Sequence, residues 1–228
     1  MREFRSLDRE AEIQISDRHL PHWFQPGVAV FVPFRTADSM PASVIIRWRD
    51  ELAQWLKREG FPVELADCVN QRVRDVEYSQ RLQALSLPKQ REFLKLRNQL
   101  FHRSLDACHG ECLLRDSAVR AFVADAIKYF DGERYELDCF VIMPNHVHCI
   151  VQFQPPYDLS MVSQSWMRFS ARQINRLLGT GGAFWQAEPF DHLIRSEKQF
   201  LYLRKYIAEN PVKAKLSADE YELYRYDA

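Results

Sequence analysis

The sequence predicts an α+β fold with an antiparallel sheet. Two patterns carry this prediction. A short segment rich in β-branched and aromatic residues precedes several stretches of helical periodicity, and a later stretch switches to a period of two on both sides of a turn signal. The predicted order is strand, helices, β-hairpin, helix and helix, which favours the α+β class.

The first predicted strand is the segment 27–35, GVAVFVPFR. Pro33 cannot donate a ladder hydrogen bond, so we expect an edge position or a bulge there. The segment 44–58 then repeats large apolar residues at helical spacing, and Pro88 can open a later helix. We therefore expect residues 1–228 to form a single domain and residues 42–112 to be an α-helical insertion within it.

A helix followed by a β-hairpin is predicted after this insertion. The segment 119–130 has the i, i+3, i+4, i+7 pattern, and Asp116 or Ser117 can cap its start. The period then becomes two, and a turn signal at Pro144-Asn145 leads into a returning strand over 146–153. The first strand of the hairpin is expected to alternate Tyr135, Leu137, Cys139, Val141 and Met143 along one face.

Two further helices follow the hairpin. The helix over 159–178 is expected to end at the glycines of 179–182. Its inward-facing residues are expected to be Trp166, Phe169, Ile174 and Leu177. Ser196 and Gln199 form a capping-box pattern that begins the last helix, which we expect to end near Asn210 because Pro211 follows.

The composition excludes several classes of protein. Its 31 Lys and Arg residues balance 31 Asp and Glu residues, so the chain is no polycation. Neither a membrane span nor a secretory signal is expected, because no apolar run approaches the roughly 18 residues of a span and the N-terminus is charged. Five irregularly spaced cysteines favour a reducing cytosol over a disulfide framework. Cys108 and Cys112 lie near His102 and His109 but fall short of the two tight ligand pairs of a structural zinc site.

His146 and His148 are the first candidate site residues. Residues two apart on a strand share a face, so the two imidazoles would lie side by side and could hold one metal ion. Val147 and Cys149 would face apolar packing on the other side. The alternative is a pair of polar residues on an exposed strand face.

Tyr206 and Asn210 are the second candidate pair. They are four residues apart on the last predicted helix, so they share a face, and Tyr206 lies at the edge of the apolar stripe. Tyr206 could therefore line a cleft against the sheet. The alternative is a half-buried tyrosine and an asparagine that merely ends the helix. Tyr202 lies further towards solvent and is the weaker candidate nucleophile.

A basic stripe is predicted on the preceding helix. Arg168, Arg172 and Arg176 are spaced by four, and the segment 165–215 holds nine Lys or Arg residues against four Asp or Glu residues. A local surplus of positive charge in a neutral protein suits contacts with phosphates. It could equally be an ordinary solvated helix face.

Together these residues resemble a known family. The run FVIMPNHVHCIV resembles the hallmark of the single-tyrosine HUH transposases, in which U is an apolar residue. The run FWQAEPFDHLIRSEKQFLYLRKYIAENPVKAKL resembles their C-terminal block. The run RHLPHWFQPGVAVFVPFRTADSMP resembles the opening of one branch, the REP-associated tyrosine transposases, although Pro33 stands where that branch is expected to have a hydroxyl residue. The resemblance covers residues 18–41 and roughly 113–216.

The resemblance implies a ferredoxin-like antiparallel sheet flanked by helices, the HUH endonuclease core. It implies cleavage and rejoining of single-stranded DNA next to a hairpin, with Tyr206 as the nucleophile of a covalent 5′-phosphotyrosine intermediate. It also implies Mg²⁺ or Mn²⁺ as cofactor, with His146, His148 and Asn210 as ligands. The expected DNA-contacting residues are Arg168, Arg172, Arg176, Arg195 and Lys213. The expected setting is the bacterial cytoplasm near the nucleoid, with no membrane partner and either a monomer or a homodimer.

Two other functions are compatible with the sequence. A domesticated, catalytically inactive protein would bind DNA hairpins without cleaving them, although every motif residue is present. A metal-dependent hydrolase of small substrates would use the histidine pair without Tyr206, but the sequence lacks a cluster of further His and Asp ligands.

Overall fold

The computed structural model describes residues 4–8, 10–11, 14–17, 21–62, 76–187 and 192–226. Cys68 lies outside the described residues, as do 18–20 of the N-terminal resemblance and 188–191 of its C-terminal block. The chain divides into two compact units, residues 1–39 with 111–228 and residues 40–110. Each unit is described by itself.

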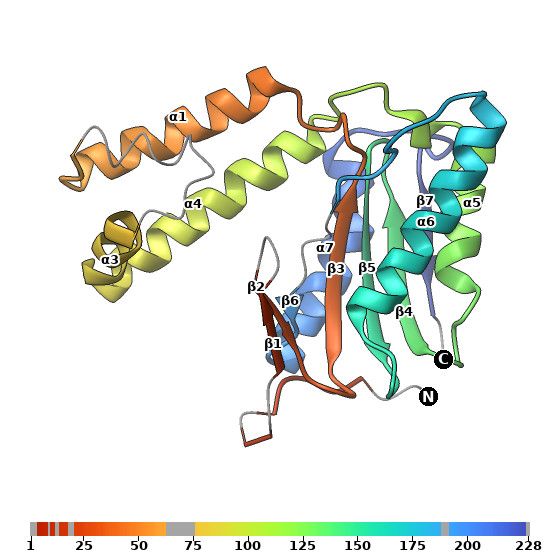
Figure 1. Cartoon of the computed structure of the whole chain (residues 1–228), viewed down its shortest axis with the longest axis horizontal. Helices are drawn as coiled ribbons and strands as arrows, with labels where there is room; N and C mark the ends of the chain where they lie inside the picture. Colours follow the sequence, from red (N-terminus) through yellow and green to blue (C-terminus); the bar gives the residue numbers. More distant parts are fainter. Residues whose placement is uncertain are drawn as a thin grey trace. The chain divides into compact units, whose positions relative to one another are not determined.

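The first unit is built on a five-stranded sheet in which all neighbouring strands are antiparallel (Figure 1). The strand order is β6 (His192–Leu193), β3 (Ala29–Arg35), β5 (His146–Phe153), β4 (Tyr135–Ile142) and β7 (Glu222–Arg225). The main helices are α5 (Ser117–Lys128), α6 (Leu159–Leu178) and α7 (Glu197–Lys213), and η2 (Leu113–Arg115) is a single 3-10 turn. A separate hairpin joins β1 (Gln14–Asp17) to β2 (Pro21–Phe24). The sequence β3-α5-β4-β5-α6-β6 with order β6-β3-β5-β4 is ferredoxin-like, so the predicted α+β fold class is confirmed.

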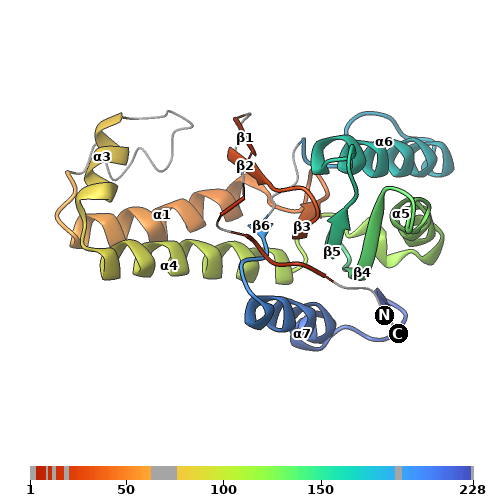
Figure 2. The ribbon, with the colours of Figure 1, turned by 90° about the horizontal axis from the view of Figure 1, so that it is seen from below.

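The sheet separates two apolar clusters of different size. The larger one packs the sheet against α5 and α6 and contains Phe140, Val147, Cys149 and Trp166. The smaller one packs the other face against α7 and contains Phe31, Val141, Ile150 and Ile207. Figure 2 shows α7 on one side of the sheet and α5 and α6 on the other. Val147 and Cys149 therefore face away from α7, as predicted.

The predicted helix boundaries have clear local causes. Asp116 accepts hydrogen bonds from the backbone N–H groups of the first turn of α5, and Asp158 and Ser196 do the same for α6 and α7. Gly179 ends α6 with φ of 65°, a conformation that glycine adopts without steric cost. These capping residues orient each helix on the sheet.

Three details of the first unit differ from the predictions. The alternation along β4 breaks at Asp138, where a β-bulge moves Cys139 to the face opposite Leu137. Phe169 and Leu177 are exposed on α6, at 46% and 51%, rather than turned inward. In addition, α7 continues through Pro211 to Lys213 because the ring removes only one N–H donor, while Ala214 N still bonds Asn210 O.

The edge position or bulge predicted at Pro33 is not found, because β3 lies between β6 and β5 and keeps its register with β5 through Pro33. Pro33 pairs with His148 of β5, whereas on the other side β6 pairs only with Val30 and Phe31. Among the residues that the structure describes, the N–H that Pro33 lacks therefore costs no hydrogen bond between β3 and β6.

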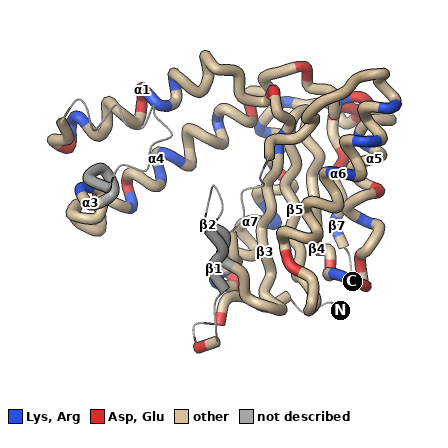
Figure 3. The backbone as a smooth tube through the Cα atoms, viewed as in Figure 1, with Lys and Arg blue, Asp and Glu red and all other residues tan. Residues whose placement is uncertain are grey.

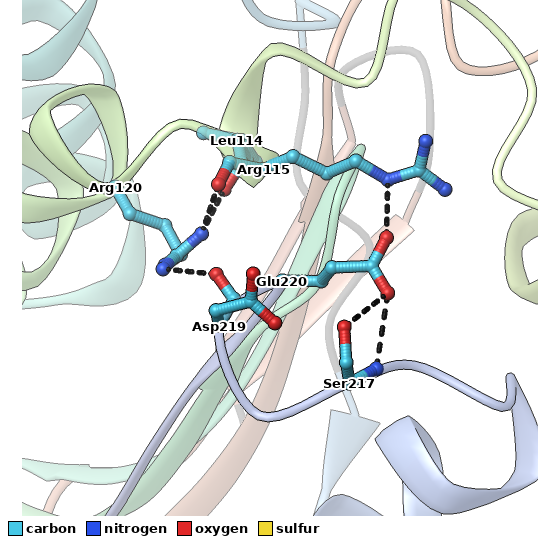
Figure 4. Close-up of polar contacts among 6 residues, drawn as sticks. All are labelled: Leu114, Arg115, Arg120, Ser217, Asp219 and Glu220. Carbon is cyan, nitrogen blue, oxygen red and sulfur yellow. Dashed lines mark hydrogen bonds and ion pairs between the residues drawn. The ribbon is translucent and has the colours of Figure 1, made fainter.

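A polar network anchors the chain after α7 (Figure 4). The buried Arg120 donates to the carbonyl oxygens of Leu114 and Asp219, at 2.9 and 2.8 Å. Arg115 pairs with Glu220 at 3.0 Å, and hydrogen bonds from Ser217 lower the pKa of Glu220. The turn between α7 and β7 is thereby attached to the start of α5.

The second unit consists of helices. These are α1 (Ala42–Arg58), α3 (Val76–Ala84) and α4 (Leu87–Asp106). An apolar cluster that includes Leu56 and Phe93 joins α1 to α4, and Trp55 Nε1 donates to Glu92 at 3.0 Å. The helices predicted over 44–58 and from Pro88 are confirmed, whereas a role for 42–112 as an insertion stays a prediction.

Charge and cysteine chemistry are consistent with the composition. Basic and acidic positions are interspersed along the chain (Figure 3). Among the described cysteines, Cys139 and Cys149 are buried free thiols. In the described ranges, no helix combines the length and the apolar character that crossing a membrane requires.

Candidate active site

The histidine pair lies on the α7 face of the central strand β5. Both side chains are fully buried, and their ring centroids are 4.7 Å apart. His148 pairs across the sheet with Val141 of β4 and Pro33 of β3. The prediction that the two imidazoles share one face therefore agrees with the structure, and they are covered rather than exposed.

Tyr206 meets this pair from the helix opposite. Its hydroxyl oxygen lies 3.4 Å from His148 Nε2, and the two ring centroids are 5.3 Å apart. Tyr206 is half-buried, whereas Tyr202 is 66% exposed on the outer face of the same helix. A phenol and an imidazole 58 residues apart in the sequence are thus brought into contact.

Asn210 lies one turn beyond Tyr206 on α7, and its side chain is almost completely buried. Neither its amide oxygen nor its amide nitrogen has a hydrogen-bond partner among the residues that the structure describes. A buried amide without partners costs free energy, and a ligand that accepts or donates to it would remove that cost.

Asn145 is also a site residue, although the sequence indicated only a turn at this position. Its side-chain oxygen Oδ1 lies 2.7 Å from His146 Nδ1. With Oδ1 as the acceptor, Nδ1 carries the proton and the lone pair of the ring is on Nε2, the arrangement that metal-binding histidines use. The sequence signal that could have indicated this contact is the position of Asn145 directly before the HVH run.

Phe31 is the second contact that the sequence did not indicate. It stacks on His148 with centroids 5.3 Å apart and an interplanar angle of 17°, and it meets Tyr206 edge-on at 6.3 Å. This aromatic packing holds both rings in place. For Phe31, the only indication in the sequence was its place in the first predicted strand.

Lys213 supplies positive charge next to Tyr206. Its Nζ lies 5.7 Å from the centre of the Tyr206 ring and pairs with Glu209 at 3.1 Å. Tyr206 and Lys213 share a face of α7 because this helix continues through Pro211. Lys205 points away, at 74% side-chain exposure, and pairs with Glu209 from the outer side.

The predicted arginine stripe lies elsewhere in the unit. Arg168, Arg172 and Arg176 are exposed on α6, which packs on the opposite face of the sheet from α7. Arg195 is exposed just before α7 begins. The structure therefore brings together the histidine pair, Tyr206 and Lys213, but not the three arginines of α6.

Metal binding at this site would use ligands other than acidic side chains. Within the described ranges, no group of three or more His, Cys, Asp or Glu side chains is arranged to hold a metal ion. Two buried imidazoles could still bind a divalent ion if an amide, water or substrate oxygen completed the set. The two histidines and the facing phenol of Tyr206 form a candidate active site, in which the phenol is a candidate nucleophile beside a candidate metal centre.

Comparison with known protein families finds a match to the segment that contains this site. Residues 113–210, which contain both histidines and Tyr206, match the family model described as IS200-like transposase. This segment is therefore similar to the IS200-like transposases, and the predicted resemblance is confirmed there.

A solved structure is also similar to part of the chain. It is described as a REP-associated tyrosine transposase bound to a REP hairpin. The two sequences are 26% identical over 42% of this chain and 57% of that one, with a TM-score of 0.35. The chain thus spans somewhat more than half of that protein. No curated protein matches the chain.

Proposed function

We propose that this protein is a metal-dependent single-stranded DNA endonuclease and strand transferase that acts next to DNA hairpins. The observation that carries the proposal is the approach of the Tyr206 hydroxyl to 3.4 Å from His148 Nε2. The hairpin as substrate rests on the sequence resemblance. Both parts of the site come from one chain, and the proposed state is a monomer or a homodimer. Access to such DNA implies a location in the bacterial cytoplasm.

Tyr206 is the proposed nucleophile. Its phenolic oxygen attacks phosphorus, a bond forms between that oxygen and the 5′ phosphate, and the bond to the 3′ oxygen breaks. The phenol releases one proton and the leaving 3′ oxygen takes up one, so the step is balanced. Because the phosphodiester bond energy is retained, attack by a 3′-OH on the phosphotyrosine rejoins DNA without ATP.

The phenol needs nearby positive charge to react near neutral pH, because a free tyrosine has a pKa near 10. Lys213 Nζ, 5.7 Å from the ring centre, is the closest cation of the site for which the structure gives a distance. We assign it to stabilising the phenolate or the adjoining phosphate. The exposed Arg168, Arg172, Arg176 and Arg195 are assigned to DNA contacts outside the reacting centre.

Mg²⁺ or Mn²⁺ is the proposed cofactor, and the residues fit it. His146, His148 and Asn210 would hold the ion, and the buried amide of Asn210 that lacks partners among the described residues supports this set. Two nitrogen ligands and one amide oxygen suit Mn²⁺ better than Mg²⁺. When bound, such an ion would neutralise charge on the scissile phosphate.

A covalent-trapping experiment tests the proposal. The protein is incubated with Mn²⁺ and a pool of single-stranded oligonucleotides that carry a hairpin with randomised flanks. Protein-linked DNA is then recovered under denaturing conditions and sequenced. We expect an adduct on Tyr206 that Tyr206→Phe abolishes, while the control Tyr202→Phe on the same helix retains it.

Two results would contradict the proposal. An adduct that survives in Tyr206→Phe would show that the nucleophile is another residue. Hairpin binding with no adduct in Mn²⁺, Mg²⁺ or Co²⁺ would instead favour the inactive hairpin-binding protein.

A further inference from the structure

Arg35 ends strand β3 beside the first histidine of the pair. In the ladder between β3 and β5, Arg35 is the direct partner of His146, and Pro33 is the partner of His148. Direct partners in an antiparallel pair share a face of the sheet, with Cβ atoms about 4.5–5.5 Å apart. The Arg35 side chain therefore leaves the sheet on the face that carries the histidine pair.

The backbone at Arg35 is fixed from both sides. Its carbonyl oxygen accepts from Gln186 N at 2.9 Å, and the next amide, Thr36 N, donates to Asn145 O at 2.9 Å. Asn145 is the residue whose side chain contacts His146. The base of the Arg35 side chain and the orientation of His146 are thus set by the same short segment.

The guanidinium group has little compensation within the protein. Nη1 donates to Ser39 Oγ at 2.9 Å, and the fully buried Ser39 hydroxyl donates onward to Thr36 O at 2.6 Å. Among the residues that the structure describes, no acidic side chain forms an ion pair with Arg35. The cation is therefore half-buried and held by neutral groups alone.

A half-buried guanidinium held only by neutral groups is unfavourable unless an anion binds to it. Burial lowers the pKa of Arg35, which reflects the free-energy cost of removing the charge from water. A guanidinium also presents a planar fork of donors that matches two oxygens of a phosphate group. The neutral hydrogen bond to Ser39 fixes one arm and leaves the other N–H donors of the guanidinium without a partner among the described residues.

We infer that Arg35 is a catalytic residue that contacts the non-bridging oxygens of the phosphate attacked by Tyr206. This inference rests on the proposed function. It adds a cation from strand β3 to the one that Lys213 supplies from α7. As the pentavalent phosphorus centre gains charge on those oxygens, the guanidinium stabilises it.

The first test is anion binding without DNA or metal. Unfolding midpoints are measured in a chelator with increasing inorganic phosphate at constant ionic strength. We expect the midpoint of the wild-type protein to rise by about 2 °C in tens of millimolar phosphate. Arg35→Gln should lose this rise, Arg35→Lys should keep part of it, and the control Arg225→Gln on the edge strand β7 should keep all of it.

The second test uses the oligonucleotide recovered by covalent trapping. Its scissile phosphate is replaced by a neutral methylphosphonate, which removes one charged oxygen. On the normal phosphodiester, we expect Arg35→Gln to slow adduct formation about 10²–10³-fold, and on the methylphosphonate the difference from wild type should shrink to less than about tenfold. Arg35→Lys should lie between the two.

The outcomes separate this inference from the function on which it rests. If no oligonucleotide forms an adduct with the wild-type protein, the proposed function fails, and with it the catalytic role of Arg35, whatever the phosphate result. If adducts form but Arg35→Gln forms them at the wild-type rate, only the inference fails. Equal slowing on both substrates, or an unchanged phosphate response in Arg35→Gln, would also overturn it and indicate a structural role.

Discussion

Arg204 Nε lies 2.9 Å from Asp138 Oδ2, and this ion pair joins the helix that carries Tyr206 to the bulge of β4. The carboxylate is almost completely buried, whereas the guanidinium is partly exposed. Tyr226 N also donates to Asp138 O at 2.7 Å, so the C-terminal segment meets the bulge at the same point. The position of α7 over the histidine pair thus depends on one extra residue in a strand.

Replacing Arg204 by Met is expected to destabilise the protein most at high pH. Burial raises the pKa of Asp138, and contacts with Cys139 and Arg204 act in the opposite direction. Without Arg204 the folded-state pKa of Asp138 rises further above its unfolded value. A carboxyl group with a raised pKa contributes stability at low pH that is lost as the pH rises through that pKa. Urea unfolding should therefore show a larger deficit at pH 8 than at pH 4.

Two comparisons identify the cause of this effect. Lys205→Met, on the exposed side of the same helix, should change the free energy of unfolding by less than about 0.5 kcal/mol. The double variant Arg204→Met with Asp138→Leu should lose the pH dependence. A deficit in Arg204→Met that is constant with pH would contradict the assignment to Asp138.

Asn210→Leu is expected to stabilise the metal-free protein while removing its response to metal. The variant replaces a buried amide that lacks partners among the described residues, so the free energy of unfolding should rise by about 1–3 kcal/mol. Mn²⁺ should raise the unfolding midpoint of the wild-type protein and of the exposed control Asn98→Leu. If Asn210→Leu responds to Mn²⁺ as the wild type does, Asn210 is not a ligand.

Tyr135→Phe is expected to weaken the core without altering the site. The buried Tyr135 hydroxyl donates to Ile127 O at 2.6 Å and accepts from Trp166 Nε1 at 2.9 Å. Removing it leaves two buried polar groups unsatisfied, so the free energy of unfolding should fall by about 1–3 kcal/mol. Tyr129→Phe, at a residue that is 75% exposed, should have little effect. Mn²⁺ binding by Tyr135→Phe should match the wild type, because this cluster lies on the other face of the sheet.

The helical unit is expected to lose stability in mild acid through His102. Burial lowers the pKa of His102 from its model-peptide value of 6.5. Because the unfolded chain takes up the proton first, the stability that neutral His102 contributes is present above pH 6.5 and is lost as the pH falls. The protection factors of α4 amides against hydrogen exchange, which are corrected for the intrinsic exchange rate, should therefore fall between pH 7 and pH 5. His102→Gln should remove this fall, and its persistence would exclude His102.

The sequence predicted the elements whose boundaries depend on local contacts. The caps at Asp116 and Ser196 and the αL glycine at 179 act within one turn, so they can be recognised without knowing the fold. The bulge at Asp138 could not be recognised in this way. The bulged Asp138 meets its partners Arg204 and Tyr226 only in the folded protein, and the period-two pattern of β4 continues unbroken through it.

The exposed Phe169 and Leu177 and the continuation of α7 have similar explanations. Whether an apolar residue at the edge of a helical stripe is covered depends on how the helix rotates on the sheet, which is a tertiary property. A proline near the end of a helix removes only one donor, and packing of the following turn decides whether the helix continues. For the candidate site, spacing brought out the histidine pair, Tyr206 and Asn210. Arg35 became visible only through its register with His146.

The unequal division of apolar contacts across the sheet has a consequence for access. In the proposed function, substrate must reach the phenol of Tyr206 and two imidazoles that lie under α7. This helix is attached to the sheet through the smaller cluster and the Arg204 ion pair. Detachment of α7 from the sheet would expose the smaller apolar cluster alone and leave the packing of α5 and α6 intact. Local opening of α7 can therefore give access to the candidate site at a fraction of the free energy of global unfolding.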